Sequence, residues 1–186
     1  MRFSFHRGSL ALDFIGTVGQ RASDAPEERL PDPAALATWF REAKLPEPSH
    51  VTEAELTAGR ALREALYVVG TQTLDGRPLD RAALEFVNAA ARGRMLGALQ
   101  LLARGKASWW TDEALRFSMG ALAEDAILRF TKERERLARC ELPSCGALLL
   151  SRSRSDPRRW CSMDTCGNRA KVAAFRARKR ERRQRG

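Results

Sequence analysis

The sequence has 186 residues, of which 44% are hydrophobic and 30% charged. This balance excludes a chain that is disordered throughout, and the length suffices for one medium domain and a small module. No apolar run reaches the roughly 18 residues of a membrane-spanning helix, and the N-terminal segment lacks the long uncharged core of a secretory signal. We therefore expect a cytoplasmic protein in a reducing environment, with no membrane partner.

Helices dominate the predictions for residues 1–139. Residues 9–19 are apolar and contain β-branched residues and turn glycines, which indicates a short strand or a strand-to-helix corner. Asp32 followed by proline is typical of a helix start, and Thr52 with Glu55 forms a capping-box pattern. The predicted helices cover about 33–44, 52–73, 81–91 and 111–139, with Asp80 capping the third and Thr111 the fourth. The fourth helix offers a surface on which a homodimer could form.

Residues 96–110 contain the apolar segments ALQLL and ASWW on either side of ARGK, which predicts a β-hairpin. The expected fold is therefore α+β: a mainly helical N-terminal domain, residues 1–139, with a small β-hairpin. No phosphate-binding loop, dinucleotide-binding glycine pattern or zinc-protease motif is present in the sequence. We therefore expect a binding protein and not an enzyme.

Three polar residues near the N-terminal turn are candidates for contacts to a small-molecule effector: Asp13, Thr17 and Arg21. The alternative for Asp13 and Thr17 is a structural role, in which their side chains cap nearby backbone groups.

All four cysteines of the chain lie within 27 residues. Their spacing is Cys-x4-Cys, fifteen residues, then Cys-x4-Cys, and two short-spaced pairs are typical of a tetrahedral four-thiolate site. Two disulfides, four unrelated buried thiols or an iron–sulfur cluster are the alternatives. The prediction is one structural zinc ion, held by Cys140, Cys145, Cys161 and Cys166.

Between the cysteine pairs, GALLLSRS and RRWCS indicate two strands around the turn SDP. The residues that follow Cys166 read as a basic helix in which Val172 and Phe175 face inward. The second unit, residues 140–186, is therefore expected to be a four-cysteine zinc finger made of a β-hairpin and a basic helix.

The positive charge is concentrated in this second unit. Residues 140–186 contain thirteen basic and four acidic residues, a net charge of +9, whereas residues 1–139 contain twenty and nineteen, a net of +1. A local cationic surface is what a polyanion requires, because neutralised phosphates release condensed counterions. The alternative is a solvated tail that only aids solubility. The expected contacts to nucleic acid are Arg152, Arg154, Arg158 and Arg159 on the hairpin, and Arg169, Lys171, Arg176, Arg178, Lys179, Arg180, Arg182 and Arg183 on the helix.

The segment from Cys140 to Arg180 resembles a CGNR-type zinc finger, with the tetrad at Cys166, Gly167, Asn168 and Arg169. The opening SLALDFIGTVG resembles that of the ABATE domain, which precedes such a finger in bacterial stress-induced transcription regulators. The resemblance implies a nucleoid-associated regulator that binds double-stranded DNA. RNA or ribosome binding, and a small-molecule sensor with secondary DNA binding, are the alternative functions.

Overall fold

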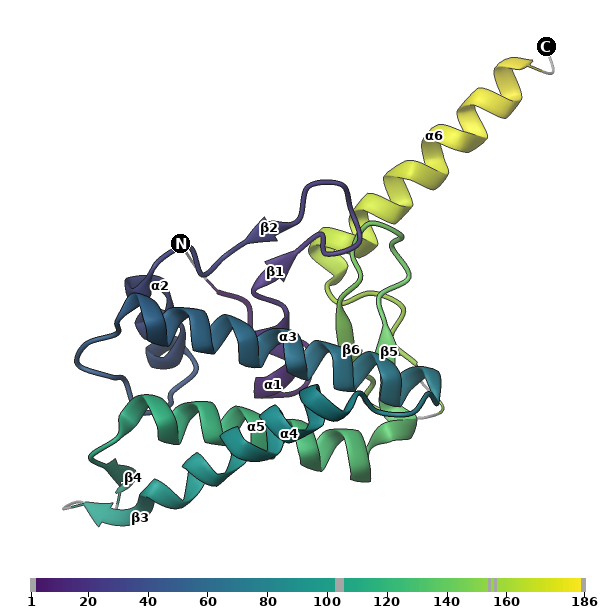
Figure 1. Ribbon diagram of the computed structural model, residues 1–186. Helices are drawn as coiled ribbons and strands as arrows, with labels where there is room; N and C mark the ends of the chain where they lie inside the picture. Colours follow the sequence, from purple (N-terminus) through teal and green to yellow (C-terminus); the bar gives the residue numbers. More distant parts are fainter. Residues whose placement is uncertain (1–2, 103–105, 154, 156, 185–186) are drawn as a thin grey trace.

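The computed structural model describes residues 3–102, 106–153, 155 and 157–184 (Figure 1). The helices of residues 10–132 pack around a core near the short helix of residues 10–15, and the strands form small antiparallel pairs. The predicted mainly helical fold with small hairpins is confirmed. The longer helices are α1 (Leu10–Ile15), α2 (Pro33–Glu42), α3 (Glu53–Asp75), α4 (Arg81–Ala91), α5 (Ala114–Lys132) and α6 (Asn168–Gln184). The short helical turns are η1 (Arg92–Leu96), η2 (Arg134–Arg136) and η3 (Met163–Gly167). The strands pair as β1 (Val18–Gly19) with β2 (Glu27–Glu28), β3 (Gly97–Leu102) with β4 (Lys106–Thr111), and β5 (Leu137–Arg139) with β6 (Leu148–Leu150).

The apolar N-terminal segment is a buried helix, so the predicted strand or strand-to-helix corner is wrong for residues 10–15. The Ser9 hydroxyl caps α1 by accepting from the Leu12 amide at 3.2 Å. Every residue of α1 after Leu10 is buried, and the helix contacts α3 and α5. A segment without a polar face can be helical when other helices surround it, and α1 occupies that central place.

The predicted starts of the next helices are confirmed at the atomic level. The Asp32 carboxylate accepts from the Ala35 amide at 2.7 Å, and the Asp80 carboxylate caps α4. The Thr52 hydroxyl accepts from the Glu55 amide while the Glu55 carboxylate accepts from the Thr52 amide at 2.8 Å, which completes the capping box. These bonds satisfy backbone donors that the first helical turn leaves without partners.

The long helix α5 begins and ends within the predicted range 111–139. Thr111 does not cap it: its hydroxyl donates to the Leu96 carbonyl at 2.8 Å and accepts from the Glu113 amide. The helix ends at Lys132, and the chain reaches β5 through η2. α5 packs against α1, α3 and α4, while Leu128 on its outer side is 41% exposed.

The strands of the C-terminal unit also differ from the prediction. Strand β6 pairs with β5, which precedes the first cysteine, in the register Leu137↔Leu150 and Arg139↔Leu148. Residues 158–162, predicted as the partner strand, form no strand in the structure as described. The first cysteine pair therefore lies in the turn of a hairpin that begins before residue 140.

Strand β6 belongs to two cores at once. Leu148 and Leu150 pack into the main core, whereas Leu149 packs among the four cysteines. Successive side chains of a strand point to opposite faces, so three residues join the helical body to the cysteine cluster.

The predicted hairpin of residues 96–110 is confirmed as β3 and β4, although residues 103–105 of its turn lie outside the described chain. Among the residues described, no helix is both long and apolar enough to cross a membrane.

Candidate metal centre and nucleic-acid interface

The four cysteine thiols converge in the structure. Cys140 and Cys145 lie in the β5–β6 turn, Cys161 lies before η3, and Cys166 lies within η3. Their Sγ atoms all lie within 4.8 Å of one another, and all four residues are buried. The Sγ atom of Cys161 is 3.6 Å from that of Cys145 and 3.5 Å from that of Cys166. Tetrahedral coordination at a zinc–sulfur distance of about 2.3 Å places sulfurs about 3.8 Å apart. The cluster therefore fits one zinc ion.

Three of the thiols perturb one another's protonation. The side chains of Cys145 and Cys161 hydrogen-bond to Cys140 and lower the pKa of that thiol to about 2. The same contact with Cys140 raises the pKa of Cys145 to about 12, and the pKa of Cys161 is raised as well. A zinc ion binds thiolates, so it would neutralise the negative charges that sulfurs packed this closely impose on one another. Four thiolates fill a tetrahedral shell, which makes the site structural.

The turn that holds Cys145 is fastened to the helical body. Gly146 has φ +63°, a left-handed conformation that favours glycine. The Tyr67 hydroxyl, from α3, donates to the Gly146 carbonyl at 3.1 Å. The Arg21 amide donates to the Cys145 carbonyl at 3.0 Å, and the Arg21 guanidinium lies 4.2 Å from the centre of the Tyr67 ring. The metal site is therefore held by residues outside the finger.

Arg21 also takes part in a network of ion pairs that the sequence did not indicate. It pairs with Glu64, which pairs in turn with Arg63 at 2.8 Å. Arg63 is buried and makes two bonds of 2.7 Å to the Glu28 carboxylate. Burial alone would raise the pKa of Glu28, but the hydrogen bonds from Arg63 and from the Leu30 amide hold it below its ordinary value. No local motif marks these residues, because their partners are distant in the sequence.

Asp13 and Thr17 make their contacts within the chain. The Asp13 carboxylate accepts from the His6 amide at 3.0 Å and from the Arg7 amide at 2.8 Å. Burial raises the pKa of Asp13 to about 6, against the lowering effect of those bonds and of the Arg7 charge. The Thr17 hydroxyl donates to the Phe14 carbonyl at 2.7 Å and accepts from Arg63 at 3.2 Å. The three candidate effector residues thus lie in one region, and each holds the backbone or another side chain.

The basic helix α6 extends away from the rest of the molecule (Figure 1). Every residue from Lys171 to Arg183 is exposed. Val172 and Phe175, predicted to face inward, are 41% and 60% exposed, so that prediction is wrong. The reason is that the described part of the finger offers no surface beside the helix beyond its first turn, where the Arg169 side chain lies 3.5 Å from that of Gln20.

At 100° per residue, the predicted basic residues of α6 cover about 200° of the helix circumference, and Ala170, Ala173, Ala174 and Ala177 lie on the other side. These basic residues are Arg169, Lys171, Arg176, Arg178, Lys179, Arg180, Arg182 and Arg183.

The hairpin arginines are placed differently. Arg152 is exposed, and Arg154 lies outside the described residues. Arg158 donates to the His6 carbonyl at 2.8 Å and to the Cys161 carbonyl at 2.9 Å, which ties the N-terminal segment to the metal loop. Arg159 pairs with Glu141 at 2.7 Å. The cationic surface that is free of such contacts is therefore mainly that of α6.

Two family models match the chain. The model described as "ABATE: Putative stress-induced transcription regulator" matches residues 8–133, and the CGNR zinc finger model matches residues 136–179. A comparison with curated proteins finds no match. The second model covers all four cysteines, β5 and most of α6.

Proposed function

Because the chain belongs to the ABATE family and ends in a CGNR zinc finger, we propose that it is a transcription regulator that binds double-stranded DNA through α6. The observation that carries this proposal is the state of that helix. It leaves the protein surface with exposed cations over about 200° of its circumference, while a four-cysteine metal site fixes its first turn.

The dimensions of α6 suit the major groove of DNA. Its 17 residues make a helix about 25 Å long. The major groove of B-form DNA is about 12 Å wide and admits one α-helix. A basic face that spans more than half of the helix circumference reaches the phosphates of both groove walls, and the guanidinium fork can also bind guanine edges. In the proposed complex, α6 therefore lies along the major groove.

Val172 and Phe175 gain a role in this complex. Both are exposed apolar side chains on an otherwise charged helix. In the major groove, apolar side chains contact the methyl groups of thymine. We expect these two residues to contribute sequence preference, while the cations supply most of the affinity.

Duplex DNA is favoured over duplex RNA because the major groove of A-form RNA is deep and too narrow for side chains to read. Competition between labelled duplex DNA and structured RNA separates these two partners. Stronger displacement by the RNA would assign α6 to an RNA site instead.

The experiment that tests the proposal is a fluorescence-anisotropy titration of duplex DNA across a salt series. The variant R176Q/R180Q/R183Q removes three cations that recur along one side of α6. Each phosphate contact contributes about 0.9 to the slope of log K against log salt, so three lost contacts flatten it by up to about 2.7.

The control variant is R41Q/R81Q/R116Q, which removes the same charge from exposed arginines of α2, α4 and α5. It is expected to keep the slope of the unmodified protein. Equal effects of the two variants would show a general charge effect and would remove α6 from its proposed role.

A further inference from the structure

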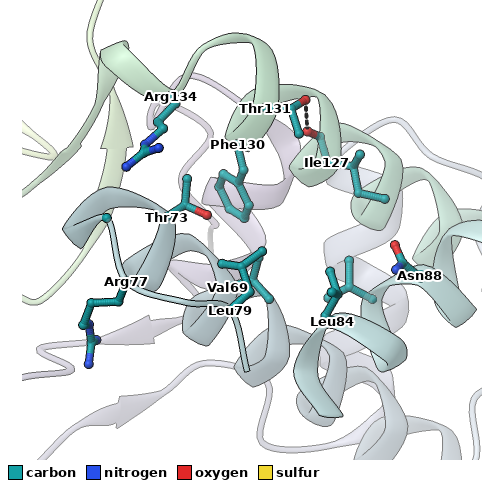
Figure 2. A pocket seen from close by; sticks show the side chains of 12 residues that line it. Val69, Thr73, Arg77, Leu79, Leu84, Asn88, Ile127, Phe130, Thr131 and Arg134 are labelled. Atoms are coloured by element: carbon teal, nitrogen blue, oxygen red, sulfur yellow. Dashed lines mark hydrogen bonds between the residues drawn. The ribbon is translucent and has the colours of Figure 1, made fainter. Parts of the chain in front are cut away.

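A cavity of about 500 Å³ lies in the helical domain, away from the metal centre (Figure 2). Its walls come from the C-terminal half of α3, the loop and helix of α4, and the end of α5. This volume falls within the range of about 300–1,000 Å³ that is typical of small-molecule sites.

The middle of the cavity is apolar. Val69, Val87 and Phe130 are buried in its walls, and Leu84 and Ile127 are half-buried beside them. Figure 2 shows the Phe130 ring and the Val69 and Leu84 side chains directed toward one space. This lining would bury the apolar body of a ligand, with the hydrophobic effect as the driving force.

One end of the cavity is cationic. Arg77 and Arg134 lie at that end, and Figure 2 shows the Thr73 hydroxyl directed toward Phe130 and the Arg77 side chain extending away from Val69. No acidic residue is among the twelve that line the cavity. Within the described chain Arg134 forms no ion pair, and Arg77 has an exposed pairing with Asp75 at 3.4 Å. A guanidinium group that is unpaired within the described residues and lies beside an apolar lining, here that of Arg134, suits a carboxylate that carries an apolar body.

We propose that this cavity binds a small amphipathic anion, specifically an aromatic carboxylate. The ring lies among Val69, Leu84 and Phe130, and the carboxylate contacts Arg134 with Arg77 and Thr73 nearby. The proposal concerns a site in the helical domain and does not depend on DNA binding.

The cavity lies beside residues that contact or lead into the strands of the zinc finger. A side chain at Gly70 would meet Leu148 of β6 at 2.8 Å and Phe130 at 2.9 Å, so both of these side chains lie over Gly70. Arg134 begins η2, the turn that leads into β5. An aromatic carboxylate would therefore contact the residues by which α5 continues into the hairpin of the metal site.

Isothermal titration calorimetry of the full-length, zinc-loaded protein tests the proposal. A naphthalene carboxylate is compared with the corresponding neutral carboxamide. We expect one molecule of the carboxylate per chain and at least tenfold weaker binding of the carboxamide, because Arg134 interacts with the charge. Equal affinities for the two compounds, or no heat from the carboxylate, would overturn the proposal.

Three variants locate the site. Arg134→Gln is expected to weaken the carboxylate at least tenfold and to leave the carboxamide unchanged. Lys132→Gln, which removes an exposed charge outside the cavity lining, is the matched control and is expected to change neither affinity. Leu84→Trp fills the cavity from a half-buried position and is expected to weaken both compounds while its melting temperature verifies folding. Undiminished carboxylate binding in Arg134→Gln or in Leu84→Trp would show that the compound binds to another surface, and it would overturn the assignment.

Discussion

At the scale of single residues, Asp13 shows how a buried carboxylate organises the N-terminal segment. Its carboxylate accepts hydrogen bonds from the backbone amides of His6 and Arg7. The Nη1 atom of the Arg7 guanidinium lies 3.8 Å from the same carboxylate oxygen. The same burial raises its pKa from an ordinary 3.8 to about 6. The folded protein therefore binds this proton more tightly than the unfolded chain does, and ionisation of Asp13 costs stability at neutral pH.

The raised pKa gives a prediction for Asp13→Asn. The asparagine side chain stays neutral at every pH and keeps an oxygen that can accept hydrogen bonds from both amides. The free energy of unfolding of the unmodified protein, minus that of the variant, is expected to rise by about 1.4 kcal/mol as the pH falls from 8 to 5. Chemical denaturation at several pH values, with zinc in excess, measures it. Asp13→Ala is the control, because it loses both amide bonds and is destabilised at every pH. A difference between the unmodified protein and Asp13→Asn that does not vary with pH would contradict the raised pKa.

Sequence reasoning succeeded where the partner of a residue lies within one helical turn. Asp32, Thr52 and Asp80 each cap a backbone amide three residues ahead, so the capping pattern alone identifies them. The four zinc ligands were recognisable from their spacing for a similar reason. The partner of Arg63 is Glu28, 35 residues away, and no local pattern predicts such a pair.

At the scale of secondary structure, the run KERERLAR illustrates how tertiary contacts override local preference. Its residues favour a helix, yet α5 ends at Lys132 and Leu137 begins β5. The strand buries Leu137 in the main core and pairs it with Leu150. Neither gain is visible without knowing that β6 lies alongside. The cavity beside Phe130 was unpredictable in the same sense, since three separate segments form it.

The exposed helix α6 allows a test of its role that spares the rest of the fold. Ala174→Pro breaks a helix at a cost of about 3 kcal/mol. Because every residue from Lys171 to Arg183 is exposed, we expect this cost to fall on α6 and not on the helical body. The melting temperature of the helical body is expected to stay within about 1 °C, while helical circular dichroism falls and affinity for duplex DNA drops at least tenfold. Ala174→Ser is the control. A large loss of melting temperature would show that α6 packs on the body, and unchanged affinity would exclude an intact α6 as the DNA-binding element.

At the scale of the whole molecule, the metal centre and the helical core share β6. Leu149 contacts the cysteine cluster, and its neighbours Leu148 and Leu150 lie in the main core. The predicted division after Arg139 falls inside the β5–β6 hairpin. Loss of the metal should therefore weaken helices that do not touch it.

The variant Cys161→Ser tests this connection. It removes one of four ligands, so zinc content should fall well below one per chain. The helical unfolding transition is expected to fall by about 5–10 °C, the shift that roughly 2–3 kcal/mol produces in a chain of this size. Ser162→Ala, which loses only the 3.3 Å cap to the Thr165 amide, is the control and should keep its zinc. An unchanged melting temperature of the helical transition after zinc loss would show two independent folding units.

The separation of α6 from the body also opens this helix to proteolysis. A protease that cuts after arginine or lysine needs a few residues of locally unfolded backbone, and a helix without tertiary packing unfolds at little cost. Residues 172–186 contain seven basic residues and one acidic residue, +6 of the total charge of +10. One cut near Lys171 would thus leave the zinc site and helical core intact while removing most of the attraction for a polyanion. Bound DNA would shield the same peptide bonds from the protease. Protein that is bound to DNA would therefore keep α6 longer than free protein.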